Sequence, residues 1–176
     1  MKIIAVSDTH LRGGTIPPTF KSLIDDCDIL LHAGDFTTME CYQAFASTGK
    51  LKAVHGNSDD RELKELLPEK LVFDVDGVKF GLVHEGALSI MDTTPLRYLA
   101  LEMGVDVLVF GHIHRPLIEQ SDVILICPGS PTSPRMSDPS VVEITIDNGN
   151  VSANIVEIEG HSCGYIDFSR KLKDKS

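Results

Sequence analysis

Imidazole, carboxylate and carboxamide side chains follow several apolar runs of this sequence, at the points where predicted strands end. His112 and His114 follow the apolar run 105–110, and Pro116 prevents a helix from starting at once. Because the two histidines are two residues apart, a locally extended backbone would point both imidazoles the same way. Four earlier apolar runs end similarly, in the segments Asp8-Thr9-His10, His32-Ala33-Gly34-Asp35, Gly56-Asn57 and His84.

These side chains carry the donor atoms of a divalent metal site. Carboxylate, imidazole and carboxamide groups without a thiolate suit borderline ions such as Mn²⁺, Fe²⁺, Ni²⁺ or Zn²⁺. Seven ligands are too many for one open catalytic ion, but they suit two ions that share a carboxylate, about 3.5–4 Å apart. Two aspartates would leave such a pair of ions with a net positive charge, which attracts phosphate. The candidate ligands are Asp8, His10, Asp35, Asn57, His84, His112 and His114.

The elements that must position these residues alternate between strands and helices in the first half of the chain. Apolar runs predict strands at 2–6, 29–32, 51–54, 71–75, 78–84, 105–110, 116–120, 123–127, 141–146 and 151–158. Helices are predicted at about 17–26, 36–47, 61–67 and 94–103. Asp76-Gly77 and Asn148-Gly149 predict two-residue hairpin turns. This order predicts one α/β domain with mixed sheets and outer helices, and ligands at the carboxyl ends of its strands.

Length and charge narrow the class of protein. The chain has 176 residues, enough for one well-buried domain, and a formal net charge of −10. This acidic balance disfavours non-specific nucleic-acid binding, which depends on cationic groups. No apolar run reaches the roughly 20 residues of a membrane helix, and the first residues lack a signal-peptide pattern, so we expect a cytoplasmic location without a membrane partner. The four cysteines are scattered, which predicts free thiols rather than a zinc site.

The ordered motifs resemble those of the calcineurin-like metallophosphoesterases. They are Asp8-Thr9-His10, Gly34-Asp35, Gly56-Asn57-Ser58-Asp59, His84 and Gly111-His112-Ile113-His114. The segment 128–135 is similar to the small prokaryotic phosphodiesterase branch of that superfamily. The resemblance implies a metallo-dependent phosphatase fold over 1–158, a four-layer α/β/β/α sandwich of two mixed β-sheets flanked by helices. The polar C-terminal tail, 159–176, is expected to be frayed or docked on the surface.

The resemblance also implies a role for each motif residue. Asp8, His10 and His114 would hold one metal ion, and Asp35 would bridge it to a second ion held by Asn57, His84 and His112. The expected cofactors are two divalent ions, Mn²⁺ first, with Ni²⁺, Fe²⁺, Zn²⁺ or Mg²⁺ as alternatives. A water shared by the ions would be deprotonated and would attack phosphorus in line, with both ions stabilising the phosphoryl charge. Catalysis would thus depend on Asp35, Asn57 and His112, and the substrate would be a small phosphate ester.

Two departures from the family pattern concern the substrate side. Many larger relatives have a histidine where this chain has Ser58. Protonation of the leaving group would then fall to water, and the rate on esters with poor leaving groups would be about 10²–10⁴-fold lower. The segment His84-Glu85-Gly86 stands where the branch usually has His-Gly-His or a similar segment. Glu85 would therefore bring a carboxylate near the metal ions. Glu85 could disfavour dianionic monoesters, act as an acid or turn outward. Arg135 is a further candidate substrate contact, as a bidentate phosphate clamp or as a merely solvated residue.

Other polar residues in or near the motifs have structural interpretations. His32 and His55 are expected to hydrogen-bond ligands or backbone rather than bind metal. Asp59 is expected to orient the backbone of its loop, and His161 and Cys163 are expected to be structural.

Two other functions compete with the phosphodiesterase or phosphatase. One is a scaffold on the same fold, like the retromer subunit, with weak or no catalysis. Presence of all seven ligands favours the enzyme, since a scaffold need not keep them. The other, a nuclease, is disfavoured by the acidic charge and by the absence of an added DNA-binding domain. Hairpin edges and the polar tail would allow a homodimer, although no pattern specifies one.

Overall fold

Two five-stranded sheets form the centre of the molecule, in a computed structural model that describes residues 1–85 and 92–173. The first sheet has the order β10-β9-β1-β2-β3. Its parallel part is β1-β2-β3, and the hairpin of β9 and β10 joins the free edge of β1 antiparallel. The strand bounds are β1 Lys2–Val6, β2 Ile29–His32, β3 Leu51–Ala53, β9 Ser140–Asp147 and β10 Asn150–Glu157.

The second sheet has the order β4-β5-β6-β8-β7 and is also mixed. Its centre is parallel, β5-β6-β8, and both edge strands, β4 and β7, are antiparallel to their neighbours. The strand bounds are β4 Lys70–Val75, β5 Val78–Val83, β6 Val107–Val109, β7 Pro116–Gln120 and β8 Ile124–Pro128. Asp76-Gly77 and Asn148-Gly149 turn β4 into β5 and β9 into β10, as predicted.

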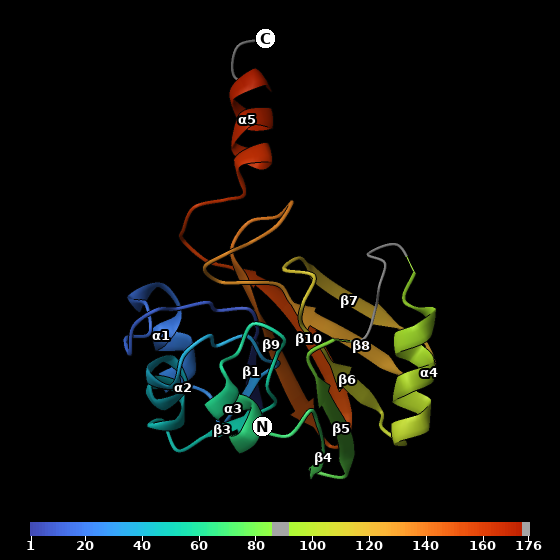
Figure 1. Ribbon diagram of the computed structural model, residues 1–176. Helices are drawn as coiled ribbons and strands as arrows, with labels where there is room; N and C mark the ends of the chain where they lie inside the picture. The colour runs from blue at the N-terminus through green and yellow to red at the C-terminus, as the bar shows by residue number, and fades with distance from the viewer. Residues whose placement is uncertain (86–91, 174–176) are drawn as a thin grey trace.

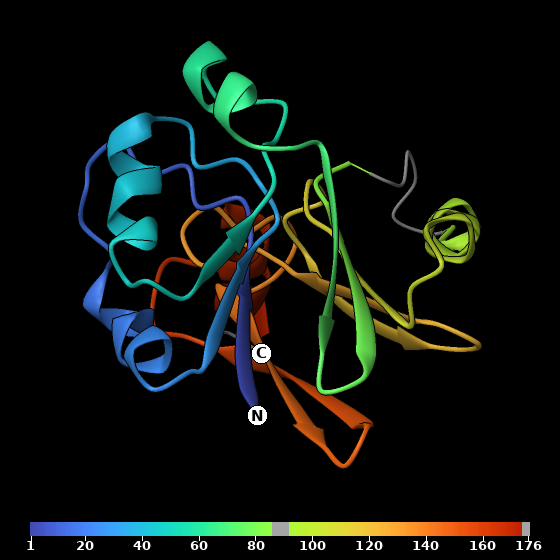
Figure 2. The same cartoon turned by 90° about the horizontal axis from the view of Figure 1, so that it is seen from below.

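Helices cover the outer faces of both sheets, which confirms the predicted four-layer α/β/β/α sandwich (Figure 1). Seen from below, α1 and α2 lie outside one sheet and α4 lies outside the other (Figure 2). The helix bounds are α1 Pro18–Asp25, α2 Met39–Ala46, α3 Arg61–Leu66 and α4 Thr94–Met103. Thr38 caps α2 by accepting a hydrogen bond from the backbone N–H of Cys41, and Gly104 ends α4 in the left-handed conformation.

Alternation along β1 shows how the layers are held together. Ile3 and Ala5 pack into the core between the two sheets, whereas Ile4 and Val6 pack under α1 and α2. Both faces are therefore covered, which explains why the strand is a continuous apolar run. A third cluster, around Leu108 and Phe110, packs the second sheet against α4. The residues that follow β1, β2, β5 and β6 come together at the carboxyl ends of these strands.

Two boundaries differ from the prediction by more than one residue. The helix expected from residue 36 begins at Met39, because Thr38 takes an extended conformation and serves as the cap. The strand expected over 105–110 is only Val107–Val109, although the Phe110 N–H still donates to the Ile126 carbonyl of β8 before the turn at Gly111 begins. Cys27, Cys41 and Cys127 are buried and Cys163 is half-buried, and all four are free thiols as predicted.

The C-terminal tail contains a helix, α5 Gly164–Lys173, that we did not predict. It extends beyond the end of the molecule opposite the start of β1 (Figure 1). The Arg170 guanidinium donates two hydrogen bonds to the Asp138 carboxylate, and the Cys163 N–H donates to the Ser137 carbonyl, so α5 is attached to the loop after β8. Residues 174–176 of the predicted tail lie outside the described residues. None of the helices in the described part of the chain has the length and hydrophobicity that a bilayer crossing requires.

Candidate metal centre

Four of the predicted ligands form a buried group, called here the first ligand group: Asp8, His10, Asp35 and His114. One ligand atom from each lies within 4.8 Å of the others. Asp8 and His10 follow β1, Asp35 follows β2 and His114 follows β6, so both sheets contribute. Asp8, Asp35 and His114 are almost fully buried, and His10 is half-buried.

The other three predicted ligands form the second ligand group, Asn57, His84 and His112. The Asn57 Oδ1 lies 2.9 Å from the His84 Nε2 and 3.0 Å from the His112 Nδ1. Asn57 is exposed, His112 is half-buried and His84 is buried at the end of β5. This group therefore opens to solvent on the side of Asn57.

The carboxylate of Asp35 joins the two groups. Its Oδ2 lies 3.5 Å from the His10 Nε2, and its Oδ1 lies 3.5 Å from the His84 Nε2. The Ser58 N–H donates a 2.8 Å hydrogen bond to the same Oδ1, which holds the carboxylate in place. One oxygen thus faces each group, as a ligand shared by two ions would require.

Two contacts bring lone pairs together at distances that a cation between them would satisfy. The His114 Nδ1 lies 2.6 Å from the Ser133 carbonyl, which can only accept, so the ring's proton is there and its Nε2 is an acceptor. That Nε2 faces the Asp8 Oδ1 at 3.2 Å, and this oxygen is buried without a hydrogen-bond partner among the described residues. Burial lowers the pKa of His114, which keeps the ring neutral.

The second ligand group repeats the pattern. The His84 Nδ1 lies 2.7 Å from the Ala33 carbonyl, so its Nε2 also presents a lone pair, toward the Asn57 Oδ1. Acceptor atoms at such distances repel each other unless a positive ion lies among them. The donor set and its orientation therefore fit divalent metal ions in both groups.

Comparison with known proteins agrees with this chemistry. A family model described as the calcineurin-like phosphoesterase superfamily domain matches residues 1–149. The chain belongs to this superfamily. A probable metallophosphoesterase of Methanothermobacter thermautotrophicus is 37% identical over 173 residues, which cover 97% of this chain and all of the relative. A phosphodiesterase of Methanocaldococcus jannaschii is 28% identical over 144 residues, covering 73% of this chain and 83% of the relative.

The fold is also found in a solved structure. Vps29 of Entamoeba histolytica, complexed with Zn²⁺, matches with a TM-score of 0.70 at 23% identity, over 89% of this chain and 99% of Vps29. At this identity the match shows the fold alone.

The backbone of this phosphoesterase domain is unusual at the ligands. Asp8, His10, Asp35, His112 and His114 all have positive φ, between 42° and 73°. Non-glycine residues avoid this region, and such strain gathers at functional sites. The extended conformation predicted for His112 and His114 is therefore wrong. A turn closed by the Ile113 N–H on the Gly111 carbonyl sends His114 to the first ligand group and His112 to the second.

Two glycines allow the ligand loops to approach each other. A Cβ at Gly56 would overlap the Asp35 carboxylate, and one at Gly111 would overlap the Ser7 hydroxyl oxygen. The Ser7 hydroxyl and the His112 N–H both donate to the Asp8 Oδ2, at 2.6 and 3.0 Å. These contacts aim the other oxygen of Asp8 at His114.

The supporting residues act mainly on the backbone. The Asp59 carboxylate accepts from the N–H groups of Asp35, Thr37 and Gly56, as expected for a residue that orients its loop, and burial raises its pKa. His32 is fully buried against Phe36, and its Nε2 lies 3.0 Å from the Thr9 hydroxyl rather than from a ligand or a backbone group as expected. Burial lowers the pKa of His32 well below its usual value.

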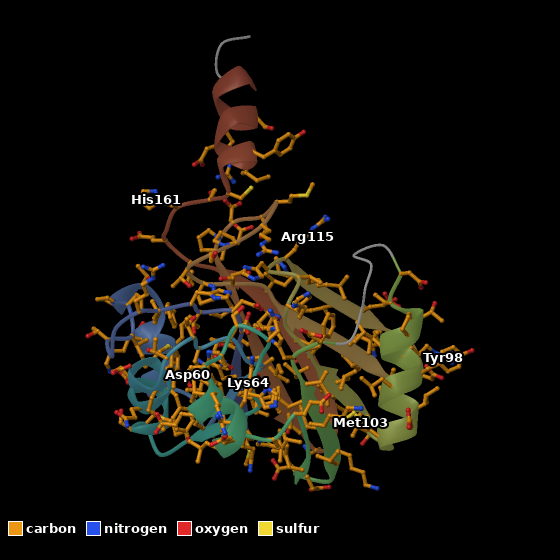
Figure 3. The ribbon with its side chains drawn as sticks, in the orientation of Figure 1. Asp60, Lys64, Tyr98, Met103, Arg115 and His161 are labelled. Atoms are coloured by element: carbon orange, nitrogen blue, oxygen red, sulfur yellow. The ribbon has the colours of Figure 1, made fainter. Side chains whose placement is uncertain are left out.

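The substrate-side candidates Ser58 and Arg135 meet this network through their backbone N–H groups. Ser58 and Arg135 are exposed, and the described contact of Arg135 runs from its backbone N–H to the His114 carbonyl. His55 lines a cavity beside Asn57, and His161 lies on the segment that leads into α5 (Figure 3). Gly86 lies outside the described residues. Sequence reasoning missed the carbonyls of Ala33 and Ser133 because carbonyl groups carry no residue-type signal.

Proposed function

We propose that this chain hydrolyses a small phosphate ester, foremost a phosphodiester, with two divalent ions held by the seven residues above. The observation that carries the proposal is Asp35, whose two oxygens face the two ligand groups. Membership of the phosphoesterase superfamily and a relative named as a phosphodiesterase support it.

The residues divide into two sets of ligands. Asp8, His10, Asp35 and His114 would hold one ion; Asp35, Asn57, His84 and His112 would hold the other. Imidazole and carboxylate ligands are compatible with Mn²⁺, which we propose as the working ion. When bound, such ions lower the pKa of a water nucleophile and offset charge on the phosphoryl oxygens.

The protein's own part is orientation and access. The carbonyls of Ala33 and Ser133 fix the tautomers of His84 and His114, so that each Nε2 is free to bind a cation. Asn57 and His112 lie on the solvent side, where an ester can reach them, and we assign them with Asp35 to the catalytic machinery. Because Ser58 replaces an imidazole, a leaving alkoxide takes its proton from water, and aryl esters are the better substrates.

The test is hydrolysis of a bis-aryl phosphate and its monoester analogue by chelator-treated protein. Mn²⁺, Ni²⁺, Mg²⁺ or Zn²⁺ is then added back singly, with Asp35→Asn as the matched variant. Metal-dependent cleavage of the diester that disappears in the variant supports the proposal. Tight metal binding without turnover by any of the ions contradicts it for generic esters.

A second function, a scaffold with weak or no catalysis, is favoured by the fold likeness to Vps29. The two proposals differ in the effect that they predict for substitutions of exposed apolar residues. For a scaffold, changing exposed apolar residues such as Tyr98 and Leu101 of α4 abolishes partner binding while metal content stays constant. For the enzyme, the same changes leave diester hydrolysis intact.

A further inference from the structure

The carboxylate of Glu85 lies with the second ligand group, at a position to which the family resemblance assigns no ligand. His84, Glu85 and His112 each offer a ligand atom, and these atoms lie within 4.8 Å of one another. The Asn57 Oδ1 is 2.9 Å from His84 and 3.0 Å from His112, so it belongs to the same cluster. Two oxygen donors and two ring nitrogens thus converge on one place.

The local backbone explains how Glu85 reaches this place. β5 ends at Val83, which is buried and paired with Lys70 of β4, and His84 turns its ring inward to the Ala33 carbonyl. Because His84 points into the molecule, the next side chain projects to the open side of the site, and Glu85 is exposed there. A carboxylate at this point faces the half of the centre that solvent and substrate enter.

Glu85 also lines a cavity of about 160 Å³ that borders the second ligand group. Asn57 and His84 lie in its wall, and Lys64 of α3, seen in Figure 3, contributes to its rim. The Lys64 ammonium donates a 2.7 Å hydrogen bond to the Asn57 carbonyl. Glu69 lines the same cavity but is not among the clustered ligand atoms of the described residues. Two glutamates of one cavity therefore differ in their relation to the metal centre.

Charge favours a carboxylate in the second ligand group. The first group has its own aspartate, Asp8, and shares Asp35 with the second group. The other ligands of the second group, Asn57, His84 and His112, bind metal ions as uncharged carboxamide and imidazole groups. Two divalent ions would keep a formal excess of two positive charges over Asp8 and Asp35. Glu85 lowers that excess to one, which matches the single negative charge of a phosphodiester better than the two charges of a monoester.

We propose that Glu85 is an additional ligand of the second metal ion, beside Asn57, His84 and His112, and that it biases the site toward monoanionic diesters. The inference rests on the proposed function for the presence of two ions. It differs from that function in what it predicts for metal affinity, because Glu85 acts on one of the two ions only.

The test is a calorimetric titration of chelator-treated, full-length protein with Mn²⁺. Wild-type protein is expected to bind two ions. Glu85→Ala is expected to weaken one binding step at least tenfold and to leave the other unchanged, since loss of groups that only support a ligand already costs about 10–100-fold. Glu85→Gln, which keeps an oxygen donor without the charge, is expected to fall between the two.

Glu69→Ala is the matched control, because it removes a glutamate from the same cavity and should bind Mn²⁺ as wild type does. Circular dichroism of each variant checks the fold, and Glu85→Gln, the smallest change, serves if Glu85→Ala does not fold. Wild-type affinity for both ions in Glu85→Gln and Glu85→Ala overturns the inference, as does a wild-type protein that binds fewer than two ions.

Hydrolysis separates this inference from the proposed function. If two ions bind and no ester is cleaved, the proposed function fails while the Mn²⁺ titration still decides the role of Glu85. If diesters are cleaved, Glu85→Ala should raise the monoester-to-diester rate ratio several-fold over wild type and over Glu69→Ala. An unchanged ratio overturns the proposed bias.

Discussion

The two ligand groups use related side chains, but the first is more deeply buried than the second. In the first, Asp8, Asp35 and His114 are at most 3% exposed, and the Asp8 Oδ1 is buried without a partner among the described residues. In the second, His84 is buried, but Asn57 is exposed, His112 is half-buried, and a cavity opens beside Asn57. A buried group of acceptors is costly until a cation satisfies it, whereas an exposed group is satisfied by water. The first group therefore suits tight binding and the second suits exchange with substrate.

Removing the shared ligand should produce the largest effect, because it damages both groups at once. We expect Asp35→Asn to lower diester hydrolysis by about 10³-fold or more, beyond the roughly 10²–10³-fold cost of losing one oriented catalytic group. The steady-state rate with saturating Mn²⁺ measures this. A loss below tenfold would mean that the two groups work independently.

Single histidine variants should separate the two groups. His114→Ala is expected to lower the Mn²⁺ affinity of the tighter site by about 100-fold or more. His112→Ala is expected to lower the affinity of the weaker site by a similar factor. Calorimetry of both variants beside wild type provides the measurement. If His112→Ala removes the tighter site instead, burial does not control affinity in this centre.

A proton donor added on the exposed side should give a moderate gain. Ser58→His is expected to raise turnover of an alkyl phosphodiester about tenfold, less than the 10²–10⁴-fold of a well-positioned acid. Turnover of a bis-aryl ester should change little, since its leaving group needs no proton. Equal gains on both esters would contradict this explanation and point to a change in metal binding.

The buried ring of His32 should make the free energy of unfolding depend on pH. Burial lowers the pKa of His32, so this ring becomes protonated near pH 6.5 in the unfolded chain but stays neutral there in the folded protein. Stability is thus complete above about pH 6.5 and falls as the pH decreases, by up to roughly 1.4 kcal/mol per pH unit.

Urea unfolding of metal-free protein at pH 7.5 and 5.5 tests this. The decrease should be smaller in His32→Asn, while the exposed His161→Asn should keep the wild-type decrease. Identical decreases in His32→Asn and wild type would show that other groups carry the pH dependence.

The sequence predicted what local chemistry determines. Apolar runs marked the strands, Asp-Gly and Asn-Gly marked two hairpins, and motif residues that are far apart in the sequence do meet at the strand ends. Their role as metal ligands stays a prediction. The left-handed backbone of His112 escaped prediction because its N–H is held by the Asp8 carboxylate, 104 residues away. Helix α5 was missed because its segment is short and polar on average, and an isolated helix of this length is only marginally stable.

The loop after β8 has two neighbours that the sequence keeps far apart. Its Ser133 carbonyl holds the ring of His114, and its Asp138 holds α5 through Arg170 and Ser162. The contacts that the described residues of α5 make with this loop are polar, and none of these residues belongs to the core clusters, so substitutions in the helix should leave the sheets undisturbed. Substitutions that shift the loop would instead move the Ser133 carbonyl and with it the ring of His114. Helix α5 is thus coupled to the candidate metal centre without being part of the core.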